Sequence, residues 1–442
     1  MATSPPKFRI DLSVTPQRLW FWFATIAAAT LITWVILVSG IAYARSRVQT
    51  ITKDSVPSVI AAQEIRKGLF KMDGDTVANY LKLTHGGKSE YDINQDRMLL
   101  SKQLVLAAQN ITYGEGESVP IGNMVGRLPM YSELTSPALE GQGNWRAKRL
   151  LMASDLLDQE LVKSANDLDK VNRDHLTSAF NESQKGLKTR AALSWGLGIA
   201  LLSVLVFVQF SLTKLTHRWV NLPLAGATLI ALMIVVSSSK LTSEEAETLR
   251  AAKLDAFDSV GYLSEAEADA ANARAKAMYA LVPEGKEKSW AACEAELEAL
   301  ASSSNSEELT RQYTREAPPQ FKGLLGNELR NITFTGEIEA ANTAVHTFSS
   351  MKQTLLALKT NPSNEGAITQ AFQPSGSVDD AYGRLDRAIE DTRQINMKEF
   401  EKDRDKAFDA LSFPSLSLSP FALAVIVLAY FGIRKRVAEY GE

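Results

Sequence analysis

The sequence predicts an all-α membrane protein with four transmembrane helices and two extracytoplasmic antiparallel helical bundles. Three observations predict this fold class. Four long apolar runs interrupt an otherwise polar chain of 442 residues. In the two polar blocks between them, apolar residues recur at three- and four-residue steps, which is typical of helices packed in a bundle. Both blocks share one order of elements, which indicates a tandem repeat.

The middle of the chain predicts a membrane hairpin. Residues 191–212 and 220–238 are apolar runs, each long enough to cross a hydrocarbon core of about 30 Å as a helix. Residues 213–219 between them read TKLTHRW, which is a short loop with positive charge. Such a loop marks the cytoplasmic side of a membrane. Both polar blocks are therefore expected on the opposite side.

Two further apolar runs, residues 19–44 and 416–433, complete the four predicted spans. The tails beyond them, residues 1–18 and 434–442, each carry more Lys and Arg than Asp and Glu. The positive-inside rule then places both termini in the cytoplasm. The predicted location is the bacterial plasma (inner) membrane, crossed several times, with both large loops extracytoplasmic.

The start of the first polar block departs from this charge rule. Arg45 and Arg47 come directly after the first span, on the predicted outer side. The rest of the charge pattern outweighs them in the topology prediction. The first span itself is too long for the apolar region of a secretory signal. An uncleaved anchor is therefore expected, although residues 42–44 resemble a cleavage site.

The first polar block, residues 45–190, is predicted to form a four-helix bundle. Its helices are expected to break at residues 85–87 (HGG), 113–120 (YGEGESVP) and 140–144 (EGQGN), because glycine, proline and asparagine favour turns. The last helix should re-enter the membrane at Ala191 without interruption.

The second polar block, residues 239–415, is predicted to repeat this plan. An unbroken helix is expected over residues 243–282 and another over residues 378–411. Residues 302–321 and 361–377 are rich in Ser, Asn, Pro and Gly and are predicted to be loops. Alanine is abundant in the first helix, where it favours the helical state and lets neighbouring helices approach closely.

The two blocks differ in charge. The first has 20 Lys and Arg against 18 Asp and Glu, whereas the second has 20 against 30. A solvated helical surface is the favoured interpretation, and a docking site for a basic partner or a cation is the alternative. No basic patch interleaved with aromatic residues is present, so nucleic-acid binding is not expected. Cys293 is the only cysteine, which excludes an intrachain disulfide.

A short motif occurs about midway along each block, before Glu115 in the first and Glu337 in the second. Because it takes the same place in both blocks, it supports duplication of a unit of about 200 residues. We expect each copy to mark the end of the second helix and the turn into the third. The motif residues are Asn110, Ile111, Thr112 and Tyr113 in the first block and Asn331, Ile332, Thr333 and Phe334 in the second.

Residues that would carry catalysis do not occur in suitable patterns. A hydrolase triad or a metal site needs several ligating or proton-transferring groups in reach of one another. The four histidines, His85, His175, His217 and His346, are scattered and have no such neighbours in sequence. The segment GEGES lacks the lysine of a phosphate-binding loop. We therefore predict a non-enzymatic protein without a cofactor or a metal.

A span that runs on into SVPSVIAAQEIRKGLFKMDGDTVANYL is followed by three more predicted helices and a second span. This layout resembles the extracytoplasmic four-helix-bundle sensor domain of bacterial chemoreceptors and sensor kinases. The resemblance covers most of residues 20–213 and, more faintly, residues 221–433. It implies a domain that binds a small ligand, often a carboxylate held by arginines, or that receives a signal from a binding protein.

The chain departs from that family after its second span. A receptor would continue there into a HAMP linker and a signalling coiled coil or kinase, but this chain turns back through residues 213–219, and no output module is expected. Arg66 and Lys67 on the first helix, with Arg146 and Arg149 at the start of the fourth, are the candidate ligand-binding residues. Solvated charges at helix ends are the alternative interpretation of these four.

Two functions from different classes fit these observations. The leading hypothesis is a membrane protein that displays two tandem bundles for sensing or partner binding and relays the signal laterally to another membrane protein. Its expected partners are the lipid bilayer, other membrane proteins and a second copy of itself. The alternative is a structural or scaffold subunit of a larger membrane or envelope complex. A transporter built on repeats fits less well, because both halves have the same orientation.

Overall fold

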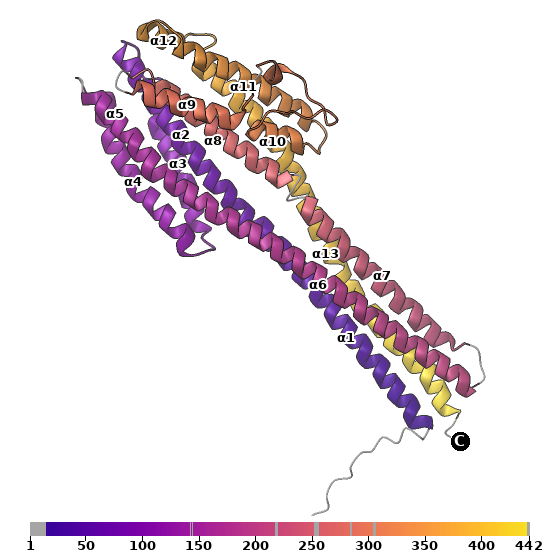
Figure 1. Ribbon diagram of the computed structural model, residues 1–442. Coiled ribbons are helices and arrows are strands. Elements are labelled where there is room, and N and C mark those ends of the chain that lie inside the picture. Colours follow the sequence, from indigo (N-terminus) through magenta and orange to yellow (C-terminus); the bar gives the residue numbers. More distant parts are fainter. Residues whose placement is uncertain are drawn as a thin grey trace, which may run out of the picture. The chain divides into compact units, whose positions relative to one another are not determined.

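A computed structural model of the chain is all-helical in the residues it describes (Figure 1), apart from two isolated β-bridges in one loop region. This confirms the predicted all-α class. The described residues are 15–141, 143, 145–216, 220–251, 256–282, 285–303 and 306–439.

The helices of the first half follow the predicted order, with two short π-helical turns between them. They are α1 (Thr15–Gln49), η1 (Thr50–Ser55), α2 (Val56–Thr84), α3 (Ile93–Gln109), α4 (Glu115–Glu140), α5 (Trp145–Leu156), η2 (Leu157–Val162) and α6 (Lys163–Thr216).

The second half contains shorter helices and one long final helix. They are α7 (Leu222–Ala251), α8 (Asp258–Tyr279), α9 (Lys286–Leu300), the 3-10 helix η4 (Ser306–Thr310), α10 (Leu324–Asn331), α11 (Glu337–Lys359), α12 (Asn364–Ala371) and α13 (Val378–Ala438).

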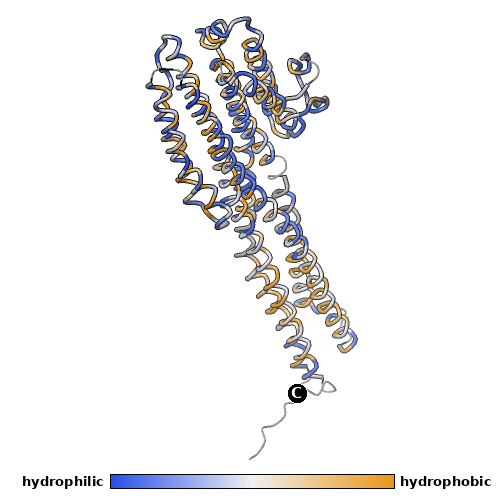
Figure 2. The backbone as a smooth tube through the Cα atoms, turned by 60° about the vertical axis from the view of Figure 1, so that its left-hand side comes forward, coloured by the Kyte–Doolittle hydropathy of each residue, from blue (hydrophilic) through white to orange (hydrophobic). Residues whose placement is uncertain are grey.

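The chain divides into two compact units. The apolar unit comprises Met1–Gln49, Ala179–Arg250 and Arg404–Glu442, and the polar unit comprises Thr50–Ser178 and Ala251–Asp403. Figure 2 shows hydrophobic residues gathered along the helices of the apolar unit, whereas hydrophilic and hydrophobic residues alternate in the polar unit. The polar unit therefore holds most of both polar blocks.

Two helical stretches are long and apolar enough to cross a membrane, Pro16–Thr84 and Trp145–Leu215. They contain the first and second predicted spans and are consistent with a membrane protein. Leu222–Ser237, in the third predicted span, is a shorter apolar helix. The full count of four spans and the boundaries of the tails and loops stay predictions.

Two of the three predicted breaks in the first block are confirmed. α2 ends at Thr84, and Gly86 has a φ of 80°, a conformation that glycine adopts without strain. α4 ends at Glu140, before the break predicted at residues 140–144, of which residues 142 and 144 lie outside the described part. The middle break was predicted too long. Residues 110–114 form the turn, in which Gly114 has a φ of 68°, and α4 begins at Glu115 and already contains Pro120.

Two predictions for the second block need correction. Residues 361–377, predicted to be a loop, contain the short helix α12. The Ser363 side chain accepts a hydrogen bond of 3.0 Å from the Gly366 N–H and starts this helix, since serine is a favoured N-cap. The helix predicted to end at residue 282 ends at Tyr279. Its predicted continuity through residues 252–255 lies outside the described residues.

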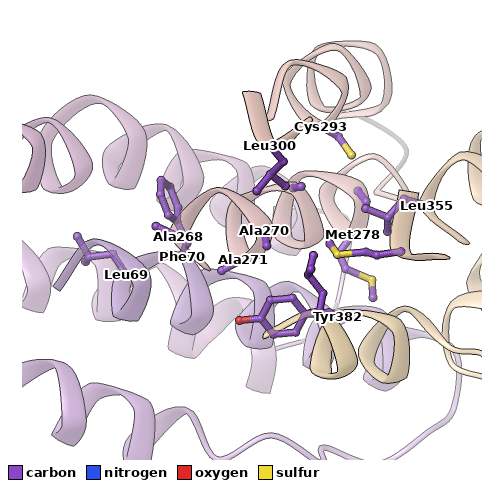
Figure 3. Packing of buried hydrophobic residues seen from close by; sticks show 14 of the residues in the cluster. Leu69, Phe70, Ala268, Ala270, Ala271, Met278, Cys293, Leu300, Leu355 and Tyr382 are labelled. Atoms are coloured by element: carbon purple, nitrogen blue, oxygen red, sulfur yellow. The ribbon is translucent and has the colours of Figure 1, made fainter. Parts of the chain in front are cut away.

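The two polar blocks share one hydrophobic core in the polar unit. α2 of the first block packs along α8 of the second, and buried residues of both belong to one contact cluster. Figure 3 shows Leu69 and Phe70 beside Ala268 and Ala271, with Tyr382 of α13 close by. The blocks, predicted as two bundles, are therefore stabilised by each other.

Candidate functional site

The first helices of the two blocks, α2 and α8, approach closely at a glycine. A Cβ atom on Gly74 would lie 3.5 Å from the Cβ of Ala275 and 3.0 Å from Nη1 of Arg274. A larger side chain at Gly74 would therefore push the two helices apart. Gly74 and Ala275 together bring the charged groups beside them into a narrow layer between the helices.

This layer is an ionic seam, which we define by its charged residues on α2, α8 and their neighbours. Lone buried charges are costly, so each must find a partner of opposite sign or change its protonation state. The seam comprises Arg66, Lys67, Lys71, Asp73 and Asp75 of α2, Glu267, Asp269, Arg274 and Lys276 of α8, and Asp96, Asp158, Asp379, Asp386 and Arg393.

Arg274 joins three helices at the centre of the seam. Its guanidinium is 2.7 Å from Asp75 on α2 and 2.7 Å from Asp379 on α13, and only 3% of its side chain is exposed. It also lies 5.3 Å from the ring centre of Tyr382, a cation–π distance. Burial opposes this charge, but Asp379 and Asp75 outweigh it and raise the pKa of Arg274. The guanidinium therefore stays charged.

Asp73 is a fully buried carboxyl whose hydrogen-bond partners are tyrosines. Its Oδ1 accepts one hydrogen bond of 2.8 Å from Tyr131 on α4 and another of 2.8 Å from Tyr279 on α8. Burial raises the pKa of Asp73 to about 6, although Lys276 and both hydroxyls favour the charged form. Asp73 thus connects three helices and titrates close to neutral pH.

Lys276 is bound to an acid of the first block. Its Nζ lies 2.6 Å from Oδ2 and 2.8 Å from Oδ1 of Asp158 in η2. Asp158 is therefore tied to α8 through a lysine whose side chain is only 8% exposed. The π-helical turn and α8 are held together by this pair.

Arg66 and Lys67, two of the predicted ligand-binding residues, belong to the seam. Arg66 Nη2 is 2.5 Å from Asp269, and Lys67 Nζ is 2.8 Å from Asp386 and 3.3 Å from Glu267. Burial raises the pKa of Glu267 to about 8 despite Lys67 and Arg393. Both candidate cations are thus paired with acids of the second block.

Arg146 and Arg149, the other two candidates, lie apart from the seam partners. Arg146 donates hydrogen bonds of 2.7 and 3.1 Å to the carbonyl oxygens of Ala138 and Leu139, which end α4. Arg149 is exposed and lies 5.2 Å from the ring centre of Trp145. The four predicted cations share no partner, so they do not form one ligand site.

The repeated motif makes the same first contact in both blocks. Asn110 donates a hydrogen bond of 2.8 Å to the Ser58 hydroxyl on α2, and Asn331 donates one of 2.9 Å to the Ser259 hydroxyl on α8. Each asparagine lies at the end of the helix that precedes the turn. Its hydrogen bond therefore connects that helix to the first helix of the same block.

The motif also makes the same turn in both blocks. The backbone N–H groups of its third and fourth residues donate to one carboxylate oxygen, Glu117 Oε2 at 2.7 and 2.7 Å and Glu337 Oε2 at 2.8 and 2.9 Å. Both glutamates are buried. In the first block the turn lies between the second and third helices, as predicted. In the second block it follows the third helix, α10, because α9 and α10 are separate helices there. Glu117 takes the place that the sequence comparison gave to Glu115.

Counted from these two glutamates, α4 and α11 bury side chains at the same spacing. Each of these buried positions in α4 therefore has an equivalent in α11 at the same number of residues from the glutamate. The shared buried positions are Glu117, Ile121, Met124, Tyr131, Thr135 and Ala138 in α4 and Glu337, Ala341, Ala344, Met351, Leu355 and Leu358 in α11.

A second stripe of positions is buried only in α11. The equivalent positions on α4 are exposed, and we call them the open stripe. Its central residues are valines in both helices, yet Val345 is 0% exposed and Val125 is 54% exposed. The stripe consists of Asn342, Val345 and Ser349 in α11 and of Gly122, Val125 and Pro129 in α4.

Residues 306–322 lie against the stripe of α11, and we call them the covering segment. The backbone N–H and carbonyl of Tyr313 bond to the Asn342 amide at 2.8 and 3.0 Å. The carbonyl oxygen of Arg311 lies 3.4 Å from Nε2 of His346, one helical turn further on. The second block therefore protects its own stripe.

Neither the seam nor the open stripe could be predicted from the sequence. The alternation of alanine with charge in α8 was compatible with a solvated helix, and those charges become buried where α8 packs against its neighbours. Val125 stands out in no sequence pattern, because its exposure depends on which segment lies over α4. The abundance of alanine in α8 was the one usable signal.

The comparison with known families points to the first block. Residues 47–181 match the family model of an actinobacterial sensor domain. The match supports a sensor domain in this part of the chain, in agreement with the resemblance predicted from the sequence. No curated protein and no solved structure gives a significant match to the chain. The class indicated by fold and comparison is thus a helical protein with a sensor domain and apolar helices suited to a membrane.

Proposed function

We propose that this chain is a non-enzymatic membrane sensor in which the first block receives a partner and the second block supports the first. One observation carries the proposal. The sensor-domain match falls on the block whose stripe on α4 is open, whereas the equivalent stripe on α11 is covered by the chain itself. The first block is therefore the one with a free surface.

The partner that fits the open stripe is an extended segment with bulky apolar side chains. On α11 the covering segment supplies such groups, with Leu309, Tyr313 and Phe321 all buried. On α4, Gly122 of the open stripe and Gly126 one turn later leave this surface without side chains. An added Cβ at either position would meet no atom within 4 Å. A peptide backbone can approach a helix closely where side chains are missing.

Binding at α4 would reach the ionic seam through two tyrosines. Tyr131 of α4 and Tyr279 of α8 donate to the same oxygen of Asp73. A displacement of α4 therefore changes the hydrogen bonds that hold α2 against α8. Small shifts of packed helices are a common form of switching.

The signal would then pass along continuous helices. α6 runs from Lys163 to Thr216 and α13 from Val378 to Ala438 without a break, so each extends from the polar unit into the apolar unit. The predicted hairpin loop, residues 213–219, is too short to hold an output module, so the proposed output is lateral, to another membrane protein. Four spans with both termini in the cytoplasm belong to this proposal.

A tandem duplication belongs to the same proposal. The equal Asn–Ser bonds, the equal glutamate-capped turns and the equal burial spacing of α4 and α11 support it. In this view the second block takes the place that a second subunit would occupy in a dimer.

The experiment compares co-purification of membrane partners with wild-type protein and with the double variant Gly122→Gln and Gly126→Gln. Both positions are exposed on α4, so the variant should fold, and the new glutamine side chains should block the open stripe. Gly383→Gln, also on a helix with no atom within 4 Å of an added Cβ, is the matched control. Partner recovery should fall about tenfold in the double variant alone. Equal recovery from all three proteins would contradict the proposal.

A scaffold function is the second candidate, and the outer face of α3 favours it. Met98 is 65% exposed and Val105 is 54% exposed, and Leu99 and Leu106 repeat the same seven-residue spacing. Such a row of apolar side chains is typical of a protein interface. A scaffold would hold its partner in fixed stoichiometry under all conditions, whereas a sensor would exchange it.

A further inference from the structure

The apolar unit contains a groove of about 500 Å³ between α1 and α6. These two helices belong to the stretches that are long and apolar enough to cross a membrane. Ile36 and Leu193 line one part of the groove, and Arg47, Lys185 and Arg190 line another. The groove is therefore amphipathic, with an apolar part and a cationic part.

The cationic part carries excess positive charge. Glu182 is the one acid among the lining residues, and it is 3.8 Å from Arg47. Within the described ranges, neither Lys185 nor Arg190 has a carboxylate within 4.0 Å. At least two cations thus face the groove without a neutralising side chain.

A tyrosine arranges the two arginines around the groove. The guanidinium of Arg190 lies 4.2 Å from the ring centre of Tyr43, and that of Arg47 lies 5.1 Å from it. The Tyr43 hydroxyl packs on Gly186, where any side chain would displace it. Arg190 Nη1 also donates a hydrogen bond of 3.5 Å to the Ser39 carbonyl. The arginines are therefore held at α1 and α6 rather than free in solvent.

We propose that this groove binds the phosphate group of an anionic phospholipid. Arginine binds phosphate through two parallel hydrogen bonds, and basic pockets beside membrane helices suit lipid headgroups. The apolar part, with Ile36 and Leu193, would take the start of the acyl chains. The site also accounts for Arg47, which departs from the positive-inside rule because it serves a ligand. The inference does not depend on the proposed sensing function.

The test measures the melting temperature of the purified full-length protein in nanodiscs of phosphatidylglycerol and of phosphatidylcholine. In detergent, inorganic phosphate is the separate probe for a soluble anion. Phosphatidylglycerol should raise the melting temperature above that in phosphatidylcholine, and the variant Lys185→Gln and Arg190→Gln should lose most of this difference. Lys185 is exposed, so Lys185→Gln alone serves as a variant that keeps the fold.

The control variant Arg434→Gln and Lys435→Gln removes the same charge from the end of α13. It should keep the lipid effect. Stabilisation by inorganic phosphate without any lipid effect would overturn the lipid as the source of the phosphate. Equal melting temperatures in both lipids, or equal losses in the two double variants, would overturn the site itself.

Discussion

Asp73 is the residue whose chemistry is most unusual in the polar unit. It is a carboxyl with 0% exposure that is held by two hydroxyls rather than by a cation. Because burial raises its pKa to about 6, folding favours the protonated form. The stabilisation that protonated Asp73 provides is fully present below the ordinary aspartate pKa of 3.8. It is lost as the pH rises through about 6.

We therefore expect Asp73→Asn to reduce the pH dependence of stability. This difference in pKa between the unfolded and the folded state changes the unfolding free energy by about 3 kcal/mol between pH values below 3.8 and above about 6. The asparagine oxygen still accepts from Tyr131 and Tyr279 but cannot ionise. Denaturant unfolding at a series of pH values from about 4 to about 8 measures the slope. Asp174→Asn, at an exposed position of α6, is the control, and an unchanged slope in Asp73→Asn would exclude this role.

Gly74 tests the close approach of α2 and α8. We expect Gly74→Leu to cost about 1–3 kcal/mol of unfolding free energy, because the new side chain must displace Arg274 and Ala275. Gly383→Leu on α13 meets no atom at its Cβ within 4 Å and should be nearly neutral or stabilising, since glycine is a poor helix former. Urea unfolding of the two variants measures the difference. Equal effects at both positions would argue against a tight seam.

The repeated turn explains where α4 and α11 begin. A single buried carboxylate oxygen satisfies two N–H groups in each turn. Hydrogen bonds to a carboxylate contribute about 1.5–3 kcal/mol each. The glutamate is thus a structural requirement of the motif, which a four-residue sequence match did not reveal.

We expect Glu117→Ala to destabilise the polar unit by about 2 kcal/mol or more, because it leaves both N–H groups without their acceptor. Glu115→Ala, two residues earlier and exposed, should change the unfolding free energy by less than about 0.5 kcal/mol. Thermal unfolding of both variants is the measurement. A larger loss in Glu115→Ala would show that the turn is capped differently.

Local signals were enough to predict many helix boundaries. The turn at Gly86 and the start of α13 at Val378 follow from glycine and proline placed between periodic segments. α12 was missed because its eight residues are fixed by one serine cap within a segment rich in turn-forming residues. The partners of Arg66 and Lys67 could not be predicted, since Asp269, Glu267 and Asp386 lie in the other block and become neighbours only in the folded chain.

Because α2 and α8 contribute to one hydrophobic core, neither block should be stable alone. We expect two co-expressed fragments, cut within residues 217–221, to co-purify, whereas the first fragment alone should unfold at a lower temperature. The reason is that α2 would lose the apolar surface of α8 and the cations Arg274 and Lys276. Fragments that are each as stable alone as together would contradict a shared core.

The open stripe of α4 is proposed to receive an extended apolar segment of a partner. The most direct measurement is photo-cross-linking in native membranes from a benzophenone amino acid at position 125, with the cross-linked peptide mapped by mass spectrometry. We expect a cross-link to one apolar segment of another membrane protein, which is lost in the Gly122→Gln and Gly126→Gln variant. A cross-link to lipid, to α4 of a second copy, or unchanged in that variant would contradict it.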